Sequence, residues 1–263
     1  MTINQQKQQN LFLLLSGVFL TNAILAEMIG VKIFSAEKTL GIAPVNMHLL
    51  GDFILDFNLT AGAVIWPVVF ITTDIINEYF GKKGVRKISF MAAGLIAYAF
   101  LVIYLVTLLA PADFWLDVNG TDPEGKPFNV NFAFNKIYTQ GLGIIVGSLT
   151  AFLIGQFLDV YVFQKLRKLT GAKMVWLRAT GSTLISQLID SFVVLSIAFY
   201  FLAPAESRWS IAQVASVGII NYIYKFAVAI LLTPLIYLGH FLIDQYLGKE
   251  LSEQMMSEAS SPA

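Results

Sequence analysis

Long apolar blocks dominate this sequence and limit what it can fold into. A helix needs about 20 mostly apolar residues to cross the hydrocarbon core of a bilayer. Six blocks meet that length, at residues 11–34, 61–80, 88–110, 140–163, 177–203 and 211–240. Only 13% of the residues are charged, roughly half the share in a typical soluble domain. The sequence therefore predicts an all-α polytopic membrane protein, with six transmembrane helices in one domain over residues 1–245.

The distribution of Lys and Arg predicts the orientation of these spans. With the N-terminus inside, eleven basic residues fall in cytoplasmic segments and four in external ones. Cytoplasmic loops carry the excess of Lys and Arg in membrane proteins. We therefore expect both termini in the cytoplasm, and we interpret the basic segment 164–173 as a topology signal before any lipid contact.

Three segments between or after the spans have their own expectations. Segment 35–60 is semi-polar, which is compatible with a short hairpin or an interfacial piece. Segment 111–139 is the longest loop. Residues 246–263 form a polar tail, which we expect to be cytoplasmic and frayed because chain ends are poorly ordered unless something binds them.

Six spans divide into two sets of three, and two such halves would have opposite orientations, as in inverted-repeat transporters. The sequence hints at this division through Thr73–Asp74 with Asn77 and through Ser186–Gln187 with Asp190. The hint is weak, so the two inverted three-helix halves stay open.

Charged and amide side chains interrupt the apolar blocks. Asp74, Asn77 and Glu78 are spaced so that they share one face of a helix. A charged side chain at the centre of a membrane helix costs about 2.5–3.5 kcal/mol on insertion scales, so such residues need partners or a wet cavity. Two carboxylates on one face exceed what helix packing requires, and this favours a functional site.

Other spans carry similar residues at helical spacing. They are Asn22 in the first span, Gln156 and Asp159 in the fourth, Ser182, Gln187 and Asp190 in the fifth, and Lys225 with Asn221 and Tyr224 in the sixth. Some of these side chains could only join helices by hydrogen bonds. For Asp190 and Lys225, a structural ion pair is as good an interpretation as a ligand role.

The residue types indicate a flat, uncharged ligand rich in hydrogen-bonding groups. A carboxylate accepts two parallel N–H bonds, and an amide both donates and accepts. Trp66, Phe152, Phe157 and Phe163 offer ring faces for stacking. A purine-like base suits this set better than an anion, which would require Arg or helix N-termini at the site.

Several other functions have no support in the sequence. The chain has no Cys and two distant His residues, so it offers no thiolate or His-based metal site, and we expect no metal or cofactor. Basic and acidic residues are equal in number, at 17 each, unlike the basic excess of a nucleic-acid binder. Motifs of common enzyme classes are missing, so we expect no catalytic activity.

Two long stretches resemble the queuosine precursor transporter family, also called the vitamin uptake transporter family. The first is LTAGAVIWPVVFITTDIINEYFGKKGVRK (59–87), which contains the family's T-D-I-x-N-E-x-[YF]-G pattern. The second is GQFLDVYVFQKLRKLTGAKMVWLRATGSTLISQLIDSF (155–192), which contains its G-Q-x-x-D, W-x-R and S-Q-x-I-D elements. Ser191 stands where the family pattern often has Thr.

The resemblance implies a bacterial inner-membrane importer of 7-deazaguanine bases, the precursors salvaged for queuosine in tRNA. It also places Asp74, Asn77 and Glu78 in the first motif. Gln156, Asp159, Arg178, Ser182, Gln187 and Asp190 fall in the second. We expect one or two of the carboxylates to bind the N–H edge of the base and an amide to bind its carbonyl.

Two alternatives remain at this point. The chain could be the substrate-binding subunit of an ATP-driven vitamin importer, with Gly141, Gly143 and Gly147 as a docking face, although these glycines serve helix packing equally well. A membrane enzyme or a structural membrane protein is the third reading. The sequence does not identify the precursor, the energy coupling or whether the protein forms a homodimer.

Overall fold

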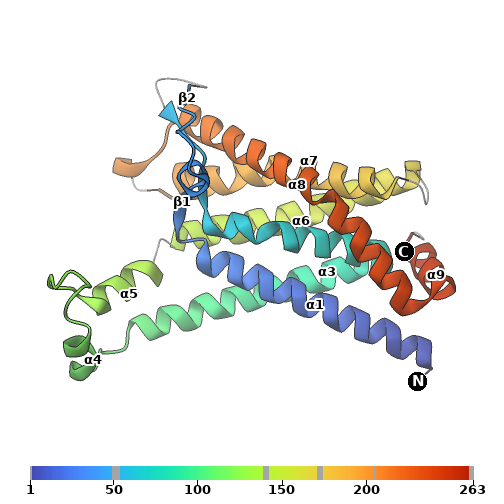
Figure 1. The fold of residues 1–263 in the computed structure, drawn as a ribbon, viewed down its shortest axis with the longest axis horizontal. Helices are drawn as coiled ribbons and strands as arrows, with labels where there is room; N and C mark the ends of the chain where they lie inside the picture. The colour runs from blue at the N-terminus through green and yellow to red at the C-terminus, as the bar shows by residue number, and fades with distance from the viewer. Residues whose placement is uncertain (1, 49–53, 139–141, 171–173, 204, 261–263) are drawn as a thin grey trace.

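The computed structural model of the protein describes residues 2–48, 54–138, 142–170, 174–203 and 205–260. Long helices run side by side along the molecule (Figure 1). The long helices are α1 (Ile3–Ile29), α3 (Trp66–Thr107), α6 (Leu142–Thr170), α7 (Val175–Leu195) and α8 (Ile211–Leu247). A π-helical segment, η2 (Ser196–Phe201), continues α7, and the short η3 (Ala205–Ser207) precedes α8.

The two ends of the bundle differ. Both termini and the last helix, α9 (Lys249–Ser260), lie at one end, which we call the terminal end (Figure 1). Small elements gather at the other, which we call the cap end. They are β1 (Ile33–Ser35), α2 (Ala36–Leu40), β2 (Met47–His48), β3 (Ile54–Leu55), β4 (Asn58–Thr60), η1 (Ala61–Val64), α4 (Asp113–Val118) and α5 (Val130–Tyr138).

Helix α3 is in fact two helical arms joined at Gly81. Gly81 has φ 64° and ψ −170°, which is not helical. A Cβ built on Gly84 would lie 3.4 Å from Cγ2 of Ile76, whereas eight residues of a straight helix span about 12 Å. The chain therefore folds back, and its two arms run in opposite directions (Figure 1). They correspond to the predicted spans 61–80 and 88–110, and segment 81–87 between them is a sharp reversal followed by the start of a helix.

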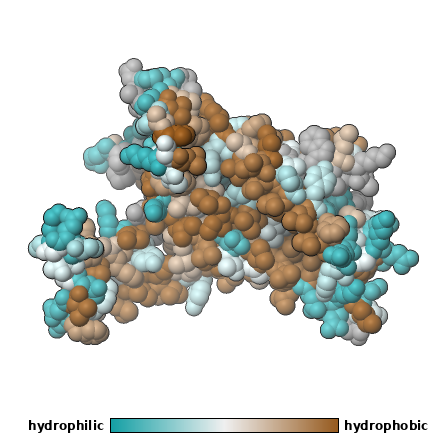
Figure 2. Space-filling view, in the orientation of Figure 1, coloured by the Kyte–Doolittle hydropathy of each residue, from teal (hydrophilic) through white to brown (hydrophobic). Residues whose placement is uncertain are grey.

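The described residues contain four helices long and apolar enough to cross a membrane, namely Ile3–Ile29, Trp66–Thr107, Leu184–Phe201 and Ile211–Leu247. In their most apolar windows only 11–28% of residues are buried inside the protein. Apolar surface accordingly covers the middle of the bundle and polar groups gather toward its ends (Figure 2). The all-α membrane architecture is thus supported, and the count of six crossings stays a prediction, as do the inverted halves. The predicted span 140–163 falls in α6, but residues 139–141 lie outside the described part.

Of the two readings of segment 35–60, a short hairpin or an interfacial piece, the structure contains the hairpin, at the cap end. Strand β1 pairs with β4 in antiparallel register, and β2 pairs with β3. Glu37 is buried beneath them and accepts bonds from the Phe57 backbone N–H at 2.6 Å and from the Ser35 hydroxyl at 3.0 Å. Burial would by itself raise the pKa of the Glu37 carboxyl, but these donors outweigh it and hold the pKa below its ordinary value.

The tail from Lys249 is not frayed over its described part, which corrects our expectation. Residues Lys249–Ser260 form α9, and its Leu251 and Met255 are 6% and 4% exposed. These two residues are four apart, so they make a narrow apolar stripe on a mostly polar helix. The stripe packs against Leu11, Tyr79 and Ile243 of α1, α3 and α8.

Replacing Glu37 is expected to destabilise the cap. Glu37→Gln leaves one buried acceptor and gains an unmatched donor, which costs about 2 kcal/mol, or roughly 4–8 °C in melting temperature. A carboxyl whose pKa is lowered by folding stabilises the folded protein at pH values above its pKa in the unfolded chain, which is about 4.3. It loses that contribution as the pH falls through its pKa in the folded protein. Thermal unfolding of purified protein from pH 7 to pH 3 should therefore show the two proteins converging in acid. Glu124→Gln, at an exposed ion pair, is the control; an equal loss there would contradict the assignment.

Candidate substrate-binding site

A cleft lies between the first arm of α3, α7 and α8. Its empty space, counted together with the open solvent at its mouth, is about 540 Å³. Its walls are mainly apolar and aromatic, with a few polar groups. The lining residues are Ala63, Trp66, Pro67, Phe70, Ile71, Asp74, Gln187, Tyr224, Lys225, Val228, Ala229, Leu232 and Ile236.

Gln187 is the polar side chain of the cleft whose state is least expected. It is 2% exposed, and neither its Oε1 nor its Nε2 has a hydrogen-bond partner among the described residues. An unsatisfied buried polar group costs about 1–3 kcal/mol. The backbone is not the cause, because the Gln187 carbonyl accepts a bond from the Ser191 hydroxyl at 2.7 Å. The side chain therefore holds a free donor and a free acceptor at the cleft wall.

An ion pair stands beside this amide. Lys225 Nζ lies 2.5 Å from Asp190 Oδ2, and each side chain is about one fifth exposed. The ion pair that we considered for these two residues is thus present, and their ligand role stays a prediction because Lys225 also lines the cleft. Since the two charges compensate each other, the ion pair does not require the ligand to be an anion or a cation.

Asp74 and two aromatic rings complete the cleft. Asp74 is buried on α3 and lines the wall together with Trp66 and Phe70. The Trp66 and Phe70 rings are stacked, with centroids 5.8 Å apart. Among the rings we expected to stack on a ligand, only Trp66 lines the cleft. Phe152 packs behind Trp66, Phe157 pairs with Phe90, and Phe163 is a core residue.

A second set of predicted residues lies in the contacts between α3, α6 and α7 and does not line the cleft. Thr73 Oγ1 donates to Gln156 Oε1 at 3.2 Å, and Ser186 Oγ donates to Asp159 Oδ1 at 3.2 Å. Ser182 is also buried. Hydrogen bonds across a membrane bundle join helices, so the alternative that these residues hold the bundle together has geometric support here.

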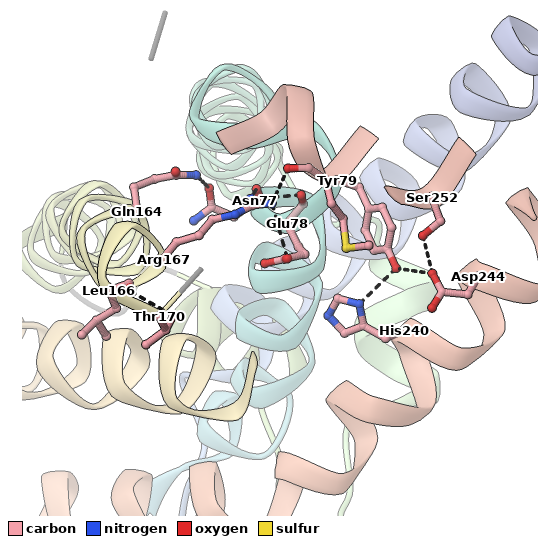
Figure 3. Close-up of polar contacts among 11 residues, drawn as sticks. Asn77, Glu78, Tyr79, Gln164, Leu166, Arg167, Thr170, His240, Asp244 and Ser252 are labelled. Atoms are coloured by element: carbon pink, nitrogen blue, oxygen red, sulfur yellow. Dashed lines mark hydrogen bonds and ion pairs between the residues drawn. The ribbon is translucent and has the colours of Figure 1, made fainter. Parts of the chain in front are cut away.

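Asn77 and Glu78 lie beyond the cleft, toward the terminal end. Asn77 Oδ1 accepts from Gln164 Nε2 at 2.8 Å, and Glu78 Oε1 lies 3.4 Å from Arg167 Nη2 (Figure 3). The face shared by Asp74, Asn77 and Glu78 is therefore divided between the cleft and a second polar cluster. We had counted Arg167 only as a topology signal, and its position opposite Glu78 is a tertiary contact that no spacing reveals.

Asn22 and Glu27 make helix contacts away from the cleft. Asn22 donates to the Val18 carbonyl of its own helix at 2.8 Å and does not line the cleft. The side chain of Arg178 lies outside the described part. Glu27, which we had given no role, accepts from the Ser148 hydroxyl of α6 at 2.6 Å.

Removing the unsatisfied amide is expected to stabilise the ligand-free protein. Gln187→Met keeps the length of the side chain but buries no polar group, so stability should rise by about 1–2 kcal/mol. Thermal unfolding of the purified protein measures the change, with Gln254→Met on the exposed face of α9 as the matched control. A fall in melting temperature for Gln187→Met would show that the amide is satisfied in the resting protein.

Comparison with known proteins identifies relatives. The sequence model of a family described as "Putative vitamin uptake transporter" matches residues 60–239. The "Probable queuosine precursor transporter" of Bacillus subtilis is 32% identical over 184 residues, covering 69% of this chain and 72% of the relative.

The "Queuosine precursor transporter" of Escherichia coli is 28% identical over 179 residues, covering 67% of this chain and 70% of the relative. Among solved structures there is no significant match. The matched region contains the cleft residues of α3, α7 and α8, and the chain belongs to the vitamin uptake transporter family, as its two motifs indicated.

Proposed function

We propose that this transporter imports 7-deazaguanine precursors of queuosine across the bacterial inner membrane and binds them in the cleft between α3, α7 and α8. The single observation that carries the proposal is Gln187, a buried amide with a free donor and a free acceptor at the cleft wall. The names of the relatives, which are queuosine precursor transporters, support the same substrate class.

The cleft chemistry suits the edge and the faces of such a base. The Asp74 carboxylate can accept the ring N–H and the exocyclic amine, and the Gln187 amide can donate to the carbonyl while accepting from a further N–H. Trp66 and Phe70 present ring faces to the flat heterocycle. Because Asp190 and Lys225 compensate each other, a neutral base can enter without leaving an unpaired charge in the membrane.

Import requires that the protein has a defined orientation in the membrane and that its binding site opens to each side of the membrane in turn. The excess of Lys and Arg on one side supports cytoplasmic termini, so the cap end faces outward in this proposal. The cleft lining begins at Ala63 and Trp66, next to the cap, and extends to Asp74 and Ile236. In this proposal the cleft is reached from the cap side in one half of an alternating-access cycle.

The alternative of a subunit in an ATP-driven importer has less support from the packing. A Cβ on Gly147 would lie 3.3 Å from the Ala198 backbone nitrogen of η2. Gly147 thus allows α6 to approach η2 within the chain, and it is not free to receive another protein. Gly143 also lies in α6, and Gly141 is outside the described residues. Uptake by the purified chain alone in liposomes would exclude the alternative.

Replacing the cleft amide is expected to impair uptake. Gln187→Met removes both hydrogen bonds offered to the base, and Asp74→Asn replaces an acceptor pair by one acceptor and one donor. Each should lower the uptake of labelled 7-deazaguanine into proteoliposomes about tenfold or more. Gln254→Met should transport normally. Uptake at the wild-type rate by both cleft variants would contradict the proposed binding site. A wild-type protein that takes up no 7-deazaguanine would contradict the proposed substrate class.

A further inference from the structure

A dense polar cluster closes the bundle beyond the cleft, and the proposed function does not use it. On α3, Asp74 lines the cleft and Glu78 follows four residues later on the same face. On α8, Leu232 and Ile236 line the cleft and His240 follows at the same spacing. The helix faces that line the cleft therefore continue to Glu78 on α3 and His240 on α8, and both side chains belong to the polar cluster.

Arg167 of α6 ties Glu78 to the C-terminal helix. Its guanidinium pairs with the Glu78 carboxylate at 3.4 Å, and its Nη1 donates to the Glu78 backbone carbonyl at 3.2 Å. Its Nη2 also donates to the backbone carbonyl of Met256 in α9 (Figure 3). The Arg167 and Glu78 side chains are 7% and 3% exposed. One buried guanidinium thus joins α3, α6 and α9.

A second set of bonds attaches α9 to α8 and α3. The Ser252 hydroxyl donates to Asp244 Oδ1, and the Tyr79 hydroxyl lies 3.0 Å from both Asp244 Oδ1 and His240 Nδ1 (Figure 3). Ser252 belongs to α9, Tyr79 to α3, and His240 and Asp244 to α8. We call these six side chains, Glu78, Tyr79, Arg167, His240, Asp244 and Ser252, the terminal lock.

The chain reversal at Gly81 provides the seat for α9. A Cβ on Gly81 would lie 3.0 Å from the Ala259 backbone oxygen, and the residue has a positive φ. The last turns of α9 therefore rest directly on the turn that joins the two arms of α3. Leu251 and Met255 seal the contact with apolar surface.

We propose that α9 is the gate on the terminal side of the transport pathway, held shut by the terminal lock, and that the Arg167 contacts to Glu78 and Met256 must break before substrate can leave toward the termini. This inference rests on the proposed function. It also assigns Glu78 of the family motif to the gate, whereas Asp74, one turn earlier, belongs to the cleft.

The test uses the natural lack of cysteine in this chain. Ala229→Cys places a single thiol in the cleft wall. A membrane-impermeant maleimide is then applied from the cap side or from the terminal side to full-length protein in oriented proteoliposomes. With the lock intact, we expect labelling from the cap side and little from the terminal side.

Opening the lock should reverse that protection. Arg167→Ala, and separately a chain that ends at Gly248, should increase terminal-side labelling of Ala229→Cys about tenfold. Tyr79→Phe, which removes only one hydroxyl from the lock, should give a smaller increase. Gln254→Ala, on the exposed face of α9, should give none.

Binding of 7-deazaguanine to the same proteins in detergent separates the two proposals. If the lock variants bind the base but show unchanged terminal-side labelling, α9 is only a packing element and the gate is wrong. If they do label but no protein binds the base, the gate stands and the substrate class fails. An increase for Gln254→Ala equal to that for Arg167→Ala would also overturn the gate, because it would show general loosening of α9.

Discussion

The structure depends on how polar side chains are satisfied inside a bundle whose outer surface faces hydrocarbon. Lipid offers no hydrogen bonds, so each buried group must find its partner within the protein. Asp190 finds Lys225, Glu78 finds Arg167, and Thr73 finds Gln156. The Gln187 amide and the Ser16 and Ser89 hydroxyls depart from this pattern among the described residues. Of these three side chains only Gln187 lines the cleft, where a ligand could satisfy it.

The polar groups lie at two levels along one line. Asp74 and Gln187 line the cleft, and Glu78 of the terminal lock follows Asp74 one turn further along α3. The two carboxylates of the first motif, Asp74 and Glu78, therefore have different surroundings. Asp74 lines the cleft, while Glu78 is bound to a guanidinium that also contacts α9. A transporter needs both a site and a barrier beside it, and in our two proposals the cleft is the site and the terminal lock is the barrier.

Local patterns in the sequence predicted the helices and the shared face of Asp74, Asn77 and Glu78, since these follow from spacing and apolar length. For residues 35–60 the sequence left a hairpin and an interfacial piece open, and the structure contains the hairpin. The partners across the bundle could not be predicted, because spacing along one helix does not tell which side chain of another helix it meets. Arg167 was therefore interpreted only as a basic residue of a cytoplasmic loop, and the contact between α9 and Gly81 could not be predicted. The two-residue apolar stripe of Leu251 and Met255 was too short to stand out in a polar tail. Which of the predicted residues bind substrate stays a prediction, although the cleft brings Asp74, Gln187 and Lys225 together.

The central claim is that the cleft recognises the hydrogen-bonding edge of a 7-deazaguanine. Isothermal titration of the purified protein with 7-deazaguanine and with its analogue lacking the exocyclic amine tests it most directly. A site built to hydrogen-bond a group rejects the analogue without it, because its own polar atoms are then left unpaired. We predict binding of the complete base and an affinity for the analogue lower by about tenfold or more. Equal affinity for the two compounds, or no binding of either, would contradict the account.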